Sequence, residues 1–250
     1  MSKGDRARQR TNARRIVEQQ KAAERRRRVT TWTSIAVVVV LVAAGLIGWT
    51  VLAQQDKATA SKLTVPPGVV DDGTAWKVGD GPVTVDLYED FMCPICHEFE
   101  NQTGATIKQL VQQHKITVRY HTVSILDRSS NGTKYSTRAA GAAAAAGVEG
   151  KFVEYHDVLY ANQPAEGSNG LTDAKLIDLG KSVGLTGDTF TNAVAKHTYD
   201  PWVTTVTNQF TRRGFTGTPT VVVNGKQLRG HNEGVPTPQL LTQAVTQAAS

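Results

Sequence analysis

The stretch from Val29 to Gln55 constrains this chain most, because it contains no charged side chain. Its central part, residues 35–53 (IAVVVVLVAAGLIGWTVLA), is apolar almost throughout. About 19 helical residues at about 1.5 Å each span roughly 28 Å, close to the ~30 Å hydrocarbon core of a bilayer. Trp32 and Trp49 stand near its two ends, where membrane interfaces favour aromatic side chains. The sequence therefore predicts one N-terminal transmembrane helix over residues 29–53.

Positive charge is concentrated in front of this stretch. Residues 1–28 carry 11 of the 28 Lys and Arg but only three of the 22 Asp and Glu, so the rest of the chain is slightly acidic. The positive-inside rule keeps residues 1–28 in the cytoplasm and places the chain after about residue 55 outside it. Because the basicity belongs to a tail, we expect no nucleic-acid-binding domain. A signal peptide cleaved after Ala53 is the alternative. The long charged segment before the apolar stretch favours an uncleaved anchor. Under either interpretation the same domain is exported.

The chain after the predicted helix divides into a stalk and one domain. Residues 54–75 carry Pro66-Pro67 and an Asp-Asp-Gly turn signal without a sustained period, which is typical of a tether. Residues 76–250 alternate between short β-branched segments and helical patterns, which indicates an α/β domain. We expect strands at 82–90, 116–126, 220–223 and 226–228, helices at 97–114 and 237–249, and a helical block over about 134–213.

The only two cysteines, Cys93 and Cys96, stand three residues apart where a predicted strand meets a predicted helix. A purely structural disulfide is one interpretation, but so short a loop gains little from closure. A zinc site is another, but zinc takes about four ligands, and the chain has no second cysteine pair and no histidines at ligand spacing. On the oxidising side of a membrane, the pair favours thiol-disulfide exchange.

The pentapeptide Cys93-Pro94-Ile95-Cys96-His97 also matches C-x-x-C-H, the attachment pattern of c-type haem. The pentapeptide alone does not decide between the two chemistries. Its context disfavours haem, because a strand leads directly into the motif and a remote histidine would have to supply any sixth ligand. A c-type haem electron carrier is therefore kept as an alternative function.

If a helix begins at the motif, Cys93 lies at its N-terminus, where free N–H groups and a partial positive charge stabilise a thiolate. Cys93 would then be the nucleophile that forms a mixed disulfide, and Cys96, one turn inward, would be the thiol that resolves it. Pro94 suits the first turn, because no amide donor is needed there.

Two longer segments carry a family resemblance. VTVDLYEDFMCPICHEFE (83–100) and GTPTVVVNGK (217–226), with the helical block between them, resemble the thioredoxin superfamily and its DsbA-like branch of exported thiol-disulfide oxidoreductases. The resemblance covers about residues 76–250 and implies a thioredoxin-like fold with a helical insertion. It also implies that Pro219 follows a cis peptide bond and faces the cysteines, and that backbone groups of Thr218 bind an extended substrate strand.

The same resemblance implies a role in the cell. The protein is expected to exchange disulfides with exported cysteine-containing proteins, first of all as a dithiol oxidase, with isomerase or reductase roles left open. A membrane quinone-linked thiol oxidase of the DsbB or VKOR type is the implied re-oxidising partner. No metal or organic cofactor is expected.

One departure from the family pattern concerns proton transfer. Many relatives place a buried carboxylate six residues before the first cysteine, as a proton relay for the resolving thiol. Here Leu87 holds that place, and the neighbouring Asp86 is expected to point to the opposite face of the strand. Glu89 and Asp90 remain nearby candidates, so the general base stays unassigned.

A second departure concerns redox tuning. Strongly oxidising DsbA proteins carry His as the second residue between the cysteines, where this chain has Ile95. An aliphatic side chain offers a thiolate neither a charge nor a hydrogen-bond donor. We therefore expect Ile95 to give a lower, more reducing potential than a histidine would, which leaves the direction of electron flow open.

Overall fold

The computed structural model describes residues 63–231 and 234–249, which belong to one compact unit, Lys62–Ser250. The predicted cytoplasmic tail (1–28), the predicted transmembrane helix (29–53) and the first part of the stalk lie outside the described residues. Among the helices that are described, none combines the length and apolar character needed to cross a membrane.

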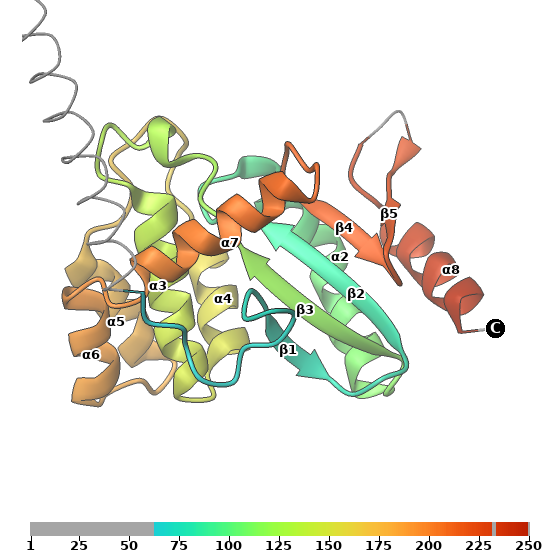
Figure 1. Cartoon of the computed structure of the whole chain (residues 1–250), viewed down its shortest axis with the longest axis horizontal. Helices are drawn as coiled ribbons and strands as arrows, with labels where there is room; N and C mark the ends of the chain where they lie inside the picture. The colour runs from blue at the N-terminus through green and yellow to red at the C-terminus, as the bar shows by residue number, and fades with distance from the viewer. Residues whose placement is uncertain (1–62, 232–233, 250) are drawn as a thin grey trace, which may run out of the picture. The chain divides into compact units, whose positions relative to one another are not determined.

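The centre of the domain is a five-stranded sheet in the order β1-β3-β2-β4-β5 (Figure 1). Its strands are β1 (Trp76–Gly79), β2 (Val83–Glu89), β3 (Ile116–Thr122), β4 (Thr220–Val223) and β5 (Lys226–Leu228). β2 pairs parallel with β3, and the other neighbours pair antiparallel. β2 is buried along nearly its whole length, as expected for a central strand covered on both faces.

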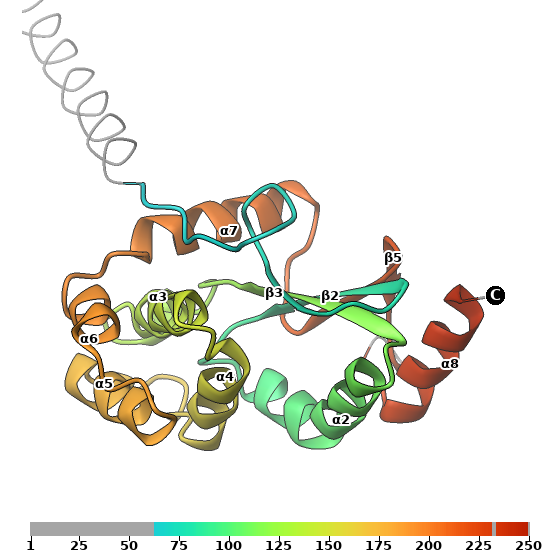
Figure 2. The ribbon, with the colours of Figure 1, turned by 90° about the horizontal axis from the view of Figure 1, so that it is seen from below.

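Helices cover both faces of the sheet and one of its ends. They are α2 (Pro94–Gln112), α3 (Tyr135–Val148), α4 (Phe152–Ala161), α5 (Asp173–Ser182), α6 (Asp188–Ala195), α7 (Asp200–Arg212) and α8 (Pro238–Ala248), with a 3-10 turn, η1, at Asp127–Ser129. Figure 2 shows α2 and α8 on one face of the sheet and α7 on the other. α3 to α7 lie between β3 and β4 in the chain, which confirms the predicted helical insertion.

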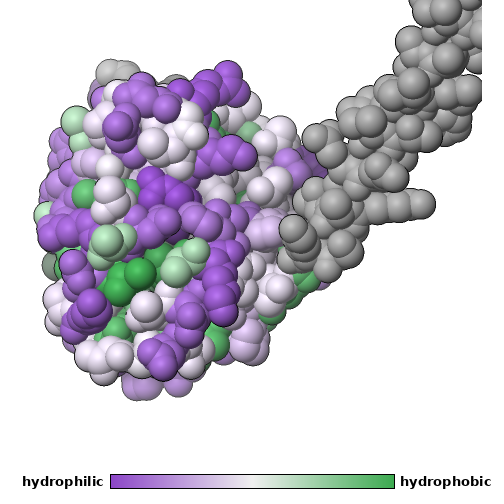
Figure 3. All heavy atoms as spheres, turned by 90° about the vertical axis from the view of Figure 1, so that its left-hand side faces the viewer, coloured by the Kyte–Doolittle hydropathy of each residue, from purple (hydrophilic) through white to green (hydrophobic). Residues whose placement is uncertain are grey.

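α3 is buried within this insertion and is built from small residues. The side chains of its run Ala142–Ala146 are at most 3% exposed. A Cβ added at Gly141 would lie 2.6 Å from Asp200 Oδ1, and one at Gly147 would lie 2.6 Å from the Trp76 indole. These small residues therefore let α3 pack closely against its neighbours. The outer surface at this end of the molecule is mostly hydrophilic (Figure 3), because the apolar sides of the helices face inward.

β3 ends at Thr122 and not at Leu126 as predicted. The N–H of Val123 still continues the β2–β3 ladder, but the N–H of Ser124 donates to Oγ1 of Thr207 at 2.9 Å and that of Leu126 to a side chain near the cysteines. Val123 donates to the Glu89 carbonyl at 2.8 Å, and Leu126 donates to Asp90 Oδ2 at 2.9 Å. The segment after β3 is thus tied to the loop that carries the cysteines.

Residues 69–75, predicted as the end of a stalk, pack against the domain. Val70 and Ala75 form an isolated antiparallel bridge, and Ala75 is wholly buried. The indole N–H of Trp202 in α7 donates to the carbonyl of Gly73 at 2.6 Å. The folded part of the chain therefore begins before β1.

Candidate functional site

The cysteine motif forms the first turn of α2. Cys93 is the N-cap residue, with extended backbone (φ −76°, ψ 114°), and Pro94 opens the helix. The helix starts earlier than predicted, at Pro94 and not at His97. Proline fits at the first helical position, because an N–H group there would have no intrahelical acceptor.

Asp90 supports the turn between β2 and this helix. Its carbonyl accepts the N–H of Cys93 at 2.9 Å. Its carboxylate accepts the N–H groups of Met92 and Leu126, both at 2.9 Å. Burial raises the pKa of Asp90 to about 7. Through its hydrogen bonds, the Asp90 side chain holds the loop that positions Cys93.

The two cysteines are free thiols with very different environments. Cys93 is 6% exposed and Cys96 is wholly buried. A hydrogen bond from the Cys96 thiol, together with the N–H groups of Cys96 and Ile95, lowers the pKa of Cys93 to about 6. Burial raises the pKa of Cys96 well above its ordinary value. At neutral pH the pair therefore consists of a Cys93 thiolate and a Cys96 thiol.

The loop before β4 faces Cys93. The peptide bond between Thr218 and Pro219 is cis, as the resemblance implied. The Cys93 thiol lies 3.3 Å from the carbonyl oxygen of Thr218 and donates to it when protonated. A groove of about 330 Å³ runs beside this contact and is lined by Ile95 and by residues 214–221, 227–229 and 234–236. Ile95 is 50% exposed and forms part of the groove wall.

A largely buried group of titratable side chains lies within electrostatic reach of Cys96. It consists of Glu89 from β2, Glu100 from α2 and His156 from α4. His156 Nε2 is 3.0 Å from Glu89 Oε2, and one ligand atom of each of the three residues lies within 4.8 Å of the others. Burial is the main cause that raises the pKa of Cys96. The hydrogen bond to Cys93 is the second cause, and the negative charge of Glu89 is the third. Carboxylates and imidazole are also residue types that bind divalent cations.

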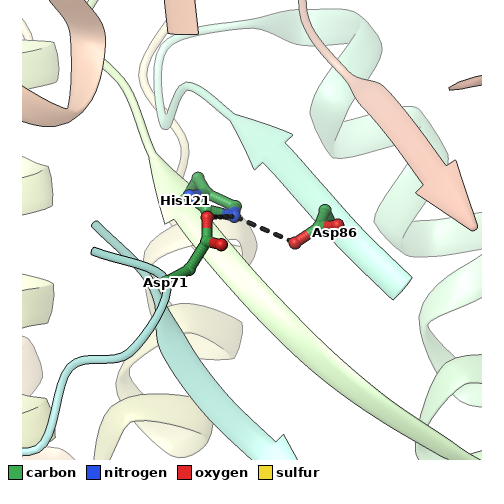
Figure 4. Close-up of side chains that lie close together, drawn as sticks. All are labelled: Asp71, Asp86 and His121. Carbon is green, nitrogen blue, oxygen red and sulfur yellow. Dashed lines mark hydrogen bonds and ion pairs between the residues drawn. The ribbon is translucent and has the colours of Figure 1, made fainter. Parts of the chain in front are cut away.

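A second such group, Asp71, Asp86 and His121, is shown in Figure 4. Arg119 binds both carboxylate oxygens of Asp86 at 2.5 and 2.7 Å and reaches Asp71 at 2.8 Å. Arg213 approaches Asp71 at 2.7 Å. Burial opposes ionisation of Asp86, but its hydrogen bonds to His121 and Arg119 lower its pKa. Two guanidinium groups balance two carboxylates, so this group is an ion-pair network that holds the 69–75 segment on the sheet.

The haem alternative does not fit this geometry. Thioether attachment needs both sulfur atoms to face the macrocycle, but Cys96 is wholly buried in the core. The ring of His97, which would be the axial ligand, packs against Tyr160 with 6.3 Å between centroids.

The structure brings the predicted site residues together at one end of the sheet. They are Cys93, Pro94, Ile95, Cys96, Thr218 and Pro219. The sequence prediction did not bring Glu100 and His156 together with Glu89. The position of Glu89 could have been predicted from the sequence, because it lies two residues after Leu87 in the same strand. Its side chain therefore points to the same face of the sheet as that of Leu87. The position of His156 could not, because it contacts Glu89 across 67 residues.

Comparisons with known proteins agree with this geometry. Residues 78–239 match the family model described as Thioredoxin. Reduced DsbA from Mycobacterium tuberculosis is 27% identical, with 71% of this chain and 93% of that chain covered and a TM-score of 0.61. The reduced disulfide bond oxidoreductase DsbG from the same organism is 28% identical, with 75% and 93% covered and a TM-score of 0.61.

A further relative is a much longer protein. The serine/threonine-protein kinase PknE of Mycobacterium tuberculosis is 30% identical over 122 residues, which are 46% of this chain and 22% of the kinase. The chain thus spans about a fifth of that relative's length. Together, the family match over most of the folded domain and the free thiol pair opposite a cis-proline loop identify the chain: it belongs to the thioredoxin family and is a protein thiol-disulfide oxidoreductase.

Proposed function

We propose that this protein is a membrane-anchored dithiol oxidase that introduces disulfides into exported cysteine-containing proteins. The observation that carries the proposal is the pairing of an acidic thiol at Cys93 with a fully buried thiol at Cys96. A stable Cys93 thiolate stabilises the reduced pair relative to the disulfide. A disulfide whose reduced form is stabilised is the stronger oxidant.

In one turnover, a substrate thiolate attacks Cys93 Sγ in the Cys93–Cys96 disulfide. The Sγ–Sγ bond breaks, Cys96 leaves with the electron pair, and a mixed disulfide joins the substrate to Cys93. A second substrate thiolate then attacks the substrate sulfur of that mixed disulfide, and Cys93 leaves as a thiolate. The substrate has lost two electrons to the cysteine pair, and its own disulfide has formed.

The groove beside Cys93 supports binding of an extended peptide segment. Backbone groups around Thr218 are the proposed hydrogen-bonding partners of such a strand. Ile95 and Phe215 contribute apolar surface to the same groove. Because main-chain groups supply the hydrogen bonds, one site can accept many cysteine-containing sequences.

Topology and re-oxidation complete the proposal. The uncharged stretch at 29–53 and the basic residues before it support a single-pass protein with a cytoplasmic N-terminus and an extracytoplasmic domain. Each turnover leaves the cysteine pair reduced, so an electron acceptor is required. A membrane quinone-linked thiol oxidase of the DsbB or VKOR type meets this need at the membrane surface.

A reductase or isomerase is the second candidate function. It is favoured by Ile95, because an aliphatic side chain supplies no charge or hydrogen-bond donor to the Cys93 thiolate. The reduction potential of the cysteine pair separates the candidates. An oxidase should lie above the glutathione poise of about −230 mV, and a reductase should lie near thioredoxin at about −270 mV.

Ile95→His is expected to raise this potential. An imidazole beside Cys93 adds a hydrogen-bond donor to the thiolate, and about 1.4 kcal/mol of added stabilisation corresponds to about 30 mV. The pKa of Cys93 should fall in parallel. Equilibration of the full-length protein in glutathione buffers measures the potential, and thiolate absorbance measures the pKa.

Gln102→His is the matched control, because it puts the same side chain on an exposed position of the same helix. It should change neither quantity. A wild-type potential at or below about −270 mV would contradict the oxidase proposal. An unchanged potential in Ile95→His would show that residue 95 does not tune the site.

A further inference from the structure

The turn between β2 and α2, residues 90–93, is buried, so its main-chain polar groups need hydrogen-bond partners inside the protein. Phe91, Met92 and Cys93 are at most 6% exposed. Asp90 serves the N–H groups of the turn, since its carboxylate accepts that of Met92 and its carbonyl accepts that of Cys93. Donors for the carbonyl groups of the turn come from a distant part of the chain.

One side chain, Gln163, reaches two of these carbonyl groups. Its Nε2 donates to the carbonyl oxygen of Cys93 at 2.9 Å and to that of Phe91 at 3.2 Å. Carbonyl oxygens accept only from the NH₂ group of an amide, so these two partners fix the orientation of the Gln163 side chain. The amide therefore joins the backbone on the two sides of Met92.

The end of α4 places Gln163. The residue lies just beyond the helix, within the helical insertion, and its own N–H donates to the carbonyl of Tyr160 at 3.1 Å. Pro164 follows it, and a residue before proline avoids the helical backbone conformation. The helix therefore stops at this point, and Gln163 leaves it in a direction that reaches the cysteine turn.

Tyr160 strengthens the same contact. Its hydroxyl donates to the carbonyl of Asp90 at 3.4 Å, and its ring packs against that of Phe91 with 5.1 Å between centroids. Together, Tyr160 and Gln163 supply donors to the carbonyl groups of Asp90, Phe91 and Cys93. The end of α4 is thus bound to the backbone that carries the nucleophile.

The Cys93 carbonyl is a sensitive point, because it also begins α2 by accepting the N–H of His97 at 3.2 Å. The sulfur of the same residue lies 3.3 Å from the Thr218 carbonyl oxygen. The N–H groups of Ile95 and Cys96 help to stabilise its thiolate. These contacts hold only while the Cys93 backbone stays aligned with the first turn of the helix.

We propose that Gln163 is a positioning residue for exchange at Cys93, whose amide holds the Cys93 backbone so that the sulfur faces the first turn of α2 and the Thr218 carbonyl. Gln163 acts through the backbone and is neutral, so it contributes alignment and not charge. The helical insertion thereby takes part in the reaction. The inference rests on thiol-disulfide exchange at Cys93 and holds for either direction of electron flow.

Gln163→Met tests the proposal, because methionine has a similar unbranched shape and no strong donor. Gln163→Glu is a second test, since it keeps the shape but turns carboxylate oxygens toward two carbonyl oxygens. Gln163→Lys is the rescue variant, because its ammonium group donates to the same acceptors. Gln112→Met makes the first substitution at an exposed position in the last turn of α2 and is the control.

Two quantities are measured in full-length protein. Thiolate absorbance of the reduced protein gives the pKa of Cys93. Because burial raises the pKa of Cys96 well above its ordinary value, the absorbance change between about pH 4 and 8 reports Cys93 alone. Equilibration with glutathione at pH 7 gives the equilibrium constant of the cysteine pair. The midpoint of thermal unfolding shows that each variant is folded.

Gln163→Met is expected to raise the pKa of Cys93 by about one unit, because the sulfur loses its alignment with the N–H groups of Ile95 and Cys96. From a wild-type pKa of about 6, this rise lowers the equilibrium constant for oxidation of glutathione by the protein about fivefold at pH 7. Gln163→Glu should raise the pKa further, since its charge also opposes the thiolate. Gln163→Lys should keep it at or below the wild-type value.

A folded Gln163→Met with the wild-type pKa and equilibrium constant would overturn the proposal. So would a Gln163→Lys whose pKa rises as much as that of Gln163→Met, because the donor would then be irrelevant. Gln112→Met should match wild type in both quantities. The absolute equilibrium constant of the wild type bears on the oxidase proposal, whereas only its change among these variants bears on Gln163.

Discussion

Cys93→Ser is expected to reduce disulfide exchange to the uncatalysed background, whereas Cys96→Ser is expected to accumulate mixed disulfides. The serine hydroxyl cannot replace a thiolate as nucleophile, and the buried Cys96 thiol, with its raised pKa, cannot take over. Without Cys96, an adduct formed on Cys93 has no internal thiol to release it.

The measurement compares the two variants in the same host. Full-length protein is recovered under acid-quenched, non-reducing conditions, and the partners attached to each variant are counted by mass spectrometry. Cys96→Ser should carry partners in disulfide linkage at Cys93, and Cys93→Ser should carry few. Equal trapping by the two variants would contradict the assignment of Cys93 as nucleophile.

Trp202→Ala is expected to lower the free energy of unfolding by about 3–5 kcal/mol, the usual loss for a buried aromatic residue. Trp202 is wholly buried in α7, and its indole N–H donates to the Gly73 carbonyl at 2.6 Å. The substitution removes a large apolar side chain and leaves that carbonyl without its donor. It also weakens the attachment of the 69–75 segment.

Two comparisons separate these effects. Trp202→Phe keeps most of the apolar volume and loses the donor, so its loss should be intermediate. Thr204→Ala changes an exposed position of the same helix and should shift stability by no more than about 0.5 kcal/mol. Urea unfolding of the reduced protein measures all three. A loss below about 1 kcal/mol in Trp202→Ala would show that the pocket collapses around the smaller side chain.

Much of the fold was predictable because its signals are local. The β-branched run before the cysteines forms β2, and Asn224-Gly225 forms the turn between β4 and β5. The side chains of Thr172 and Thr237 accept the N–H groups of Lys175 and Leu240 and so cap α5 and α8. In each case the residues that decide the structure lie within a few positions of one another.

The unpredicted features depend on contacts between distant segments. β1 is only four residues long and was not predicted as a strand, because its structure comes from pairing with β3. The network around Asp71 joins residues of the 69–75 segment, β2 and β3 with Arg213, the residue that follows α7. The contact between His156 and Glu89 joins α4 to the end of β2, across 67 residues of chain, which no local pattern encodes.

Transfer of one disulfide to a reduced protein tests the proposed oxidase most directly. Full-length protein in its Cys93–Cys96 disulfide form is mixed at pH 7 with an equal amount of a reduced, unfolded exported protein that has two cysteines. Acid quenching, alkylation and mass spectrometry then follow both partners. The result expected is one disulfide gained by the substrate for each Cys93–Cys96 disulfide lost. A substrate that stays reduced while the Cys93–Cys96 disulfide persists would contradict the oxidase function.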